Sequence, residues 1–89
     1  MKYFDWYNDK NKWLTANRGI SFEFIIECIK QGDLIYIADN HHPYEHQKVY
    51  MVKVDEFIYE VPYVEDDSKI FLKTIYPSRK STDKYLSDN

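Results

Sequence analysis

The stretch KVYMVKVDEFIYEVPYVEDDSKIFLKTIY, residues 48–76, contains three segments that are rich in β-branched and aromatic residues. The segments span 48–54, 57–64 and 69–76, with only two to four polar residues between them. Residues of these kinds favour strands, and short polar connections join antiparallel neighbours. The stretch therefore predicts an antiparallel meander at the centre of the fold.

Two further segments before the meander have strand character. Residues 34–38, LIYIA, predict a strand, and the polar loop DNHHPYEH, residues 39–46, connects it to the meander. Residues 2–6, KYFDW, suit either an edge strand or an apolar plug. Pro62 lies inside the second strand of the meander. Because proline has no N–H to donate to a neighbouring strand, it predicts an edge or a bulge there.

Two helices are predicted ahead of these strands. The first spans 8–17, starts with cap-type residues and ends before Gly19. The second spans 22–31, between Ser21, a typical N-cap residue, and Gly32. Both helices are thus bounded by residues that favour helix ends.

Apolar residues on the helices indicate how they pack. The second helix has a core-facing stripe at the i, i+3, i+4, i+7 spacing, formed by Phe22, Ile25, Ile26 and Ile29. Phe24 and Cys28 widen this stripe, so we expect a helix covered on two sides and a buried thiol. A last helix, 81–88, is predicted with Ser81 as its N-cap and with Tyr85 and Leu86 packed on the sheet.

These elements predict one α+β domain, residues 1–89, with two N-terminal helices and a C-terminal helix on one face of a small antiparallel sheet. The net charge of −3 argues against a nonspecific nucleic-acid coat protein, although the segment from residue 69 onward is locally basic. No apolar run reaches the ~20 residues of a membrane span and no signal peptide is recognisable. A cytoplasmic protein is the expectation.

Three segments resemble the BrnT family of bacterial toxins: GISFE at 19–23, YEVPYVEDD at 59–67 and FLKTIYPSRKSTDKYL at 71–86. The likeness extends from Trp6 to Leu86 and includes the order and lengths of the elements. It implies a fold similar to that of RelE-type toxins and a ribonuclease activity that blocks translation. It also implies a ribbon-helix-helix antitoxin similar to BrnA, through which alone DNA would be contacted.

Some positions depart from the family pattern. The usual end of the last strand, Ile-Ser-Ala-Arg, corresponds here to the longer Ile75-Tyr76-Pro77-Ser78-Arg79, and the tyrosine of the following helix corresponds to Tyr85. Asn17-Arg18-Gly19 replaces a usual Lys-His-Gly, and Lys48 replaces a usual arginine. A lysine keeps the charge but loses the paired hydrogen bonds that a guanidinium makes to phosphate.

RNA cleavage without a metal ion uses the 2′-hydroxyl of the substrate as the nucleophile. The protein must then transfer protons and stabilise a phosphorane. Arg79 is predicted to stabilise the phosphorane because a guanidinium binds two phosphate oxygens at once. Tyr85 or His46 would transfer a proton. The alternative is that Arg79 and Lys80 only solubilise the strand end and pair with Asp83.

The residues predicted to bind RNA are Lys48, Lys69, Lys73, Ser78 and Lys80. Strand alternation places Lys69, Phe71 and Lys73 on one sheet face. Charge beside an aromatic ring is typical of surfaces that bind single-stranded RNA. Packing of Phe71 in a core, with both lysine ammonium groups reaching solvent, is the alternative interpretation.

Three histidines, His41, His42 and His46, lie in the polar loop. Their spacing is not a strong metal-ligand pattern, so the sequence predicts no metal ion and no cofactor. A solvated loop and a role in proton transfer both remain open. For proton transfer we favour His46, because it lies close to the strand that begins at Lys48.

Two functions are compatible with the sequence. The first is a toxin that cleaves RNA and is neutralised by a ribbon-helix-helix antitoxin. The second is a catalytically silent module that keeps the toxin fold and binds only a protein partner. The sequence pI of about 5.5 and the lysine at position 48 favour the second function.

Overall fold

Strands β3 (Lys48–Val54) and β4 (Phe57–Glu65) form the centre of the sheet, as the sequence predicts. The structure is a computed structural model that describes residues 2–86. In it the whole of β3 pairs antiparallel with residues 57–63 of β4. Asp55 lies at the turn between them with φ 57°, a conformation that aspartate tolerates better than most residues. β2 (Leu34–Asp39) pairs antiparallel with the other edge of β3.

The predicted strand 69–76 is interrupted in the structure. It forms β5 (Lys69–Leu72) and the short β6 (Tyr76–Pro77), and the prediction of strand for 73–75 is wrong. The interruption lies opposite Pro62 of β4. Lys73 N donates to Pro62 O at 2.8 Å, but Pro62 has no N–H to donate in return. The predicted irregularity at Pro62 is therefore confirmed, as a break in the strand beside it.

Residues 73–75 use this break to reach the core. The Ile75 side chain is fully buried, and Arg18 Nη1 donates to the Ile75 carbonyl oxygen at 2.5 Å. Tyr76 then returns to the sheet opposite Glu60. A side chain from α1 thus satisfies the backbone group that the sheet leaves unpaired.

The sheet is mixed rather than purely antiparallel, which corrects the prediction. β1 (Tyr3–Asp5) pairs parallel with β5, so residues 2–6 do supply an edge strand. The strand order is β1-β5-β4-β3-β2, and β6 pairs with β4. A parallel pair needs a long crossover, and here the whole of the chain from α1 to β4 lies between the two strands.

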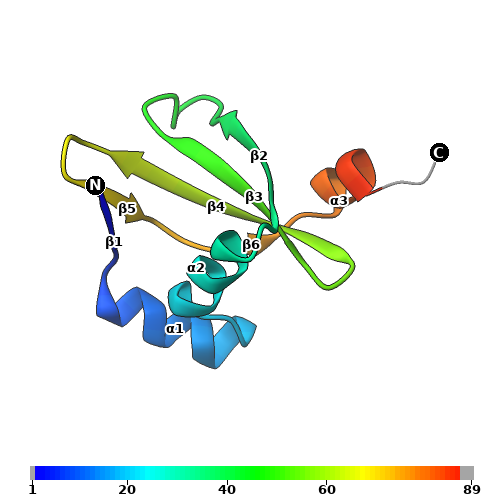
Figure 1. The fold of residues 1–89 in the computed structure, drawn as a ribbon, viewed down its shortest axis with the longest axis horizontal. Helices are drawn as coiled ribbons and strands as arrows, with labels where there is room; N and C mark the ends of the chain where they lie inside the picture. The colour runs from blue at the N-terminus through cyan, green and yellow to red at the C-terminus, as the bar shows by residue number, and fades with distance from the viewer. Residues whose placement is uncertain (1, 87–89) are drawn as a thin grey trace.

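Helices α1 (Asn8–Arg18) and α2 (Phe22–Lys30) match their predicted positions. Gly19 ends α1 with φ 67°, and Ser21 caps α2 by accepting a hydrogen bond from Phe24 N at 3.1 Å. Figure 1 shows both helices below the sheet in this view. No helix within residues 2–86 is long and apolar enough to cross a bilayer.

One face of the sheet carries the main core. Phe22, Ile25 and Cys28 of α2 pack there against alternate strand residues such as Val52 and Val61. The thiol of Cys28 is buried, as predicted. Phe24 is 47% exposed, so the expectation that α2 is covered on two sides is wrong. The helix packs against the sheet through one stripe, and nothing in the described chain covers its Phe24 side.

Helix α3 (Arg79–Leu86) lies on the opposite face of the sheet, separated from α1 and α2 (Figure 1). Its Tyr85 and Leu86 pack against Val49, Met51 and Ile58, which alternate with the residues of the main core. Packing of Tyr85 and Leu86 on the sheet is confirmed. The expectation that all helices cover one face is wrong, because β3 and β4 present apolar residues on both faces.

Ser78, not Ser81, caps α3. Ser78 Oγ accepts from Ser81 N at 3.1 Å, and the Ser78 carbonyl oxygen accepts from Thr82 N at 3.0 Å. The helix therefore begins two residues earlier than predicted, and Ser81 is buried within it. Residues 87 and 88 of the predicted helix lie outside the described residues.

Candidate functional site

A groove runs over the sheet face that α1 and α2 leave open. Three adjoining hollows form it, and neighbouring hollows share lining residues. Lys73 lines the first and second, and Asn40 and His41 line the second and third. The floor of the groove includes Val64, Pro62 and Glu60, which are alternate residues of β4 and so lie on one face. At about 3.3 Å per strand residue, the floor from Val64 to Glu60 is about 13 Å long. We call this surface the sheet groove.

The first hollow, of about 270 Å³, is lined by two lysines, two carboxylates and the aromatic rings of Tyr7 and Phe71. The Phe71 ring lies 4.9 Å from the Tyr7 ring in an edge-to-face arrangement. The ammonium groups of Lys69 and Lys73 lie 5.6 and 5.2 Å from the Phe71 ring centre. Lys69, Phe71 and Lys73 therefore share one face, as strand alternation predicts. Lys69 Nζ also lies 3.5 Å from a carboxylate oxygen of Asp5.

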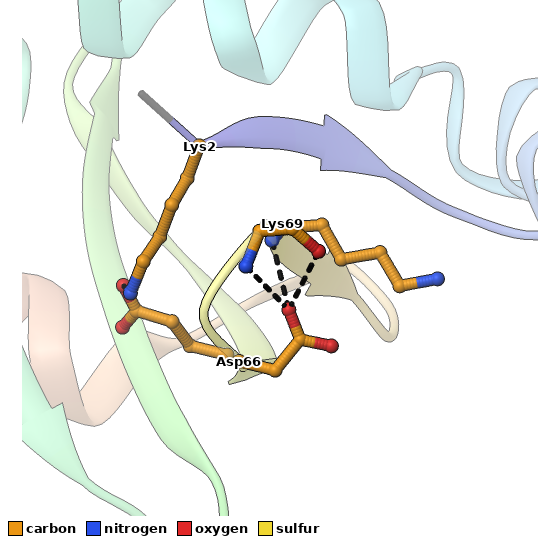
Figure 2. A network of polar contacts seen from close by, with 5 residues as sticks. Lys2, Asp66 and Lys69 are labelled. Atoms are coloured by element: carbon orange, nitrogen blue, oxygen red, sulfur yellow. Dashed lines mark hydrogen bonds and ion pairs between the residues drawn. The ribbon is translucent and has the colours of Figure 1, made fainter.

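Acidic side chains fix the turn beside this hollow. Figure 2 shows Asp66 Oδ1 accepting hydrogen bonds from the backbone nitrogens of Ser68 and Lys69, both at 2.9 Å. Lys2 Nζ lies 2.6 Å from Glu65 Oε2 at the start of the same turn. The hydrogen bonds from the backbone nitrogens of Ser68 and Lys69 are the main cause of the lowered pKa of the Asp66 carboxyl. The turn thus sets where β5 begins and where Lys69 leaves the sheet.

The third hollow contains a carboxylate that the sequence analysis did not select. Glu60 Oε1 accepts from Tyr76 Oη at 3.0 Å, and Glu60 Oε2 accepts from Ser81 Oγ at 2.6 Å. Partial burial alone would raise the pKa of Glu60, but the hydroxyls of Ser81, Ser78 and Tyr76, with His41 nearby, outweigh it and lower that pKa. Burial beside this carboxylate raises the pKa of Tyr76 to about 12. Glu60 is therefore held as an anion between β4, β6 and α3.

We expect Glu60 to make folding stability depend on pH. Its folded-state pKa lies below the ordinary value of 4.5, so the stabilisation is complete above that value and is lost as the pH falls through the folded-state pKa. Chemical denaturation between about pH 6 and about pH 3 should show a smaller loss of unfolding free energy for Glu60→Gln than for the wild type. Glu56→Gln, which changes the charge equally at an exposed turn, is the control. Equal pH slopes for Glu60→Gln and the wild type would contradict this assignment.

Four of the predicted site residues line the sheet groove. Lys69 and Lys73 lie at one end, and Lys80 and Tyr85 lie at the other. The Tyr85 ring stacks on the Tyr36 ring at 5.7 Å. The structure therefore places Lys69 and Lys73 along one surface with the lysines of α3, although residues 74–78 separate Lys73 from that helix in the chain.

The other predicted site residues do not line these three hollows. His46 and Lys48 line a neighbouring hollow, which shares Val64, Glu65 and Asp66 with the first one, and Lys48 Nζ lies 2.8 Å from Asp39 Oδ1. Ser78 caps α3, and the Arg79 guanidinium lies 5.3 Å from the Phe57 ring centre. The structure does not bring Arg79, His46 and Tyr85 into one pocket, and their catalytic roles stay predictions.

Sequence reasoning missed Glu60, Tyr76 and Tyr7 of the groove. One signal for Glu60 was present: it is a single carboxylate inside the apolar segment FIYEVPYV, residues 57–64. A charge on a strand between apolar neighbours needs partners, and Tyr76 and Ser81 supply them across the break in the sheet. Within residues 2–86, no three His, Cys, Asp or Glu side chains are arranged to hold a metal ion.

The element order and the six-stranded mixed sheet define an α+β fold. Among solved structures, this chain is similar to the crystal structure of YafQ from E. coli strain BL21(DE3), with a TM-score of 0.53 and 8% sequence identity. The similarity covers 91% of this chain and 97% of that chain. No model of a known protein family matches the sequence. A search of curated proteins also finds no match. The shared feature is therefore the fold.

Proposed function

We propose that this protein is the toxin of a type II toxin–antitoxin pair and cleaves RNA without a metal ion. The observation that carries the proposal is the sheet groove, in which basic and aromatic side chains follow one another along an open sheet face. The RelE-like fold and the sequence resemblance to BrnT toxins support the same function. Translation would stop because its RNA templates are cut.

The groove has the chemistry that single-stranded RNA requires. Ammonium groups of Lys73, Lys80 and Lys84 stand along it to neutralise phosphates. The rings of Tyr7 and Phe71 at one end offer surfaces on which bases stack, and stacking on aromatic rings is tolerant of sequence. The lining of the groove holds four lysines and four carboxylates, so RNA binding would depend on where the individual ammonium groups stand and not on an excess of positive charge.

Cleavage would follow the 2′-hydroxyl route and yield a 2′,3′-cyclic phosphate and a 5′-hydroxyl. Incubation of the purified chain with RNA in a translation extract, and with free RNA in the presence of EDTA, tests this. A 2′-deoxy substitution at the cut site should block cleavage. RNA that stays intact in both assays would contradict the proposal.

Arg79→Ala, assayed beside the wild type, tests the predicted stabilisation of the phosphorane by Arg79.

We expect the double variant Lys73→Ala/Lys80→Ala to bind single-stranded RNA more weakly, because it loses two phosphate contacts. The slope of log affinity against log salt should fall by about 1.4, at about 0.7 per phosphate contact for single strands. Fluorescence anisotropy with a labelled RNA over a range of salt concentrations measures this slope. Lys12→Ala/Lys30→Ala is the matched control, because it removes the same charge from exposed positions on α1 and α2. An equal effect in both double variants would mean that only the total charge matters.

A ribbon-helix-helix antitoxin similar to BrnA is the partner we propose, with DNA bound only through it. The silent-module alternative draws support from β2, an edge strand on which Ile35, Tyr36 and Ile37 are 40%, 53% and 46% exposed. Exposed apolar side chains on an unpaired edge favour binding to another protein chain. A stable complex with such an antitoxin, combined with no RNA cleavage by the free protein, would favour the silent module.

A further inference from the structure

The loop between β2 and β3 holds His41 at a fixed place beside the sheet groove. Asn40 N donates to Gln47 O at 3.0 Å, which closes the base of the loop. Tyr44 N donates to His41 O at 2.8 Å, and His41 N donates to Asn40 Oδ1 at 3.0 Å. Both backbone polar groups of His41 are therefore bonded within the loop. His41 lies next to the point where the loop joins the sheet.

Hydrogen bonding determines which ring nitrogen of His41 carries the hydrogen. His41 Nδ1 lies 3.2 Å from the carbonyl oxygen of His42. A carbonyl oxygen only accepts, so Nδ1 donates in this contact. In the neutral imidazole Nε2 then has a free lone pair, which is the state that a general base needs.

His41 lines the second and third hollows of the sheet groove and so stands at its middle. Lys73 lines the second hollow, and Lys80 and Lys84 line the third, so cations lie on both sides of it. Glu60, an anion held by Tyr76 and Ser81, lines the third hollow with His41. A phosphate bound by the lysines would bring the adjoining 2′-hydroxyl to this part of the groove.

We propose that His41 is the general base of RNA cleavage in the sheet groove, an assignment that rests on the function proposed above. Nε2 takes the 2′-hydroxyl proton while O2′ forms a bond to phosphorus and the P–O5′ bond breaks. The 5′-oxygen leaves with the electron pair of that bond and receives a proton from the hydroxyl of Tyr85, which lines the same groove. Exchange with water then returns both side chains to their starting states.

The other two histidines of the loop have different surroundings. His42 Nδ1 lies 3.0 Å from Glu45 Oε2, and its side chain is 88% exposed. His46, which the sequence favours, lines a hollow that adjoins the first hollow at Val64, Glu65 and Asp66, and it does not line the second or third hollow, where His41 lies. The geometry therefore separates three histidines that the sequence places within six residues of one another.

The test is RNA cleavage by His41→Ala, with and without added imidazole. We expect kcat to fall by about 10²- to 10⁴-fold, the usual contribution of a general base, with little change in KM. Because His41 is exposed at the groove, imidazole from solution should enter the vacated space and restore part of the activity. A residue with only a structural role would show no such rescue. The probe is a 5′-labelled single-stranded RNA of mixed sequence.

His42→Ala is the matched control in the same loop and should keep wild-type activity. Loss of activity in His46→Ala together with full activity in His41→Ala would overturn the assignment and support His46. Loss in His41→Ala that is confined to KM, or that imidazole does not relieve, would also overturn it. A wild-type protein that cleaves no RNA would refute the proposed function itself and this assignment with it. Full activity in His41→Ala refutes this assignment alone.

Discussion

Replacing Phe22 by alanine is expected to destabilise the folded protein by about 3 to 5 kcal/mol, the usual range for a buried aromatic side chain. Phe22 is 0% exposed and is one of the largest fully buried side chains. Its ring lies 5.6 Å from the Trp6 ring, so its loss leaves a cavity and removes the support of the chain that leads from β1. Domains of this size are stable by only about 5 to 15 kcal/mol. We therefore expect a melting temperature lower by at least about 12 °C, measured by circular dichroism.

Phe24→Ala is the matched control on the same helix. Phe24 differs from Phe22 by two positions in sequence and is 47% exposed. Removing its ring should change the free energy of unfolding by no more than about 0.5 kcal/mol, as for most surface substitutions. Equal destabilisation by the two variants would mean that both sides of α2 are buried, contrary to the packing described here.

The contrast between Phe22 and Phe24 shows how far the sequence predicts the fold. Helical spacing correctly selects Phe22 and Ile25 as core residues, because periodicity identifies one apolar face. It does not show whether a second layer covers the other side of the helix, since that depends on elements distant in the chain. The sequence likewise gives no signal that residues 2–6 would pair parallel with β5, because both strands are short and lie far apart in the chain.

The candidate site shows the same limit. The position of Lys69 and Phe71 on one face follows from alternation along β5, and the Lys73 ammonium group lies beside the same Phe71 ring although Lys73 comes just after the strand. Whether these residues line the same surface as Lys80 and Tyr85 depends on the break opposite Pro62 and on where α3 packs. Pro62 marks the break in the sequence, but no local pattern fixes the direction of the chain after it. For the same reason, the short distance in sequence from His46 to the strand that begins at Lys48 did not show which hollow each loop histidine lines.

Replacing Thr82 by valine is expected to destabilise the protein by about 1 to 3 kcal/mol, although the side chain keeps its shape. Thr82 Oγ1 accepts a hydrogen bond from Ile58 N at 2.8 Å and donates to Ser78 O at 2.7 Å. Ile58 is 0% exposed, so its N–H would have no partner and no access to water. Urea denaturation of Thr82→Val measures the loss. Thr15→Val, which removes an exposed hydroxyl from α1, should change stability by no more than about 0.5 kcal/mol.

Thr82→Ser separates the hydrogen bonds from the packing. Serine keeps the hydroxyl and loses only a methyl group, so we expect it to retain most of the stability that valine loses. If valine were tolerated as well as serine, the bonds from Thr82 to β4 and Ser78 would not anchor α3. The anchoring matters for the groove because Lys80, Lys84 and Tyr85 line it from α3. A helix of eight residues has little stability by itself, so its place on the sheet depends on such contacts. Thr82→Val should therefore weaken RNA binding as well as folding, whereas Thr15→Val should affect neither.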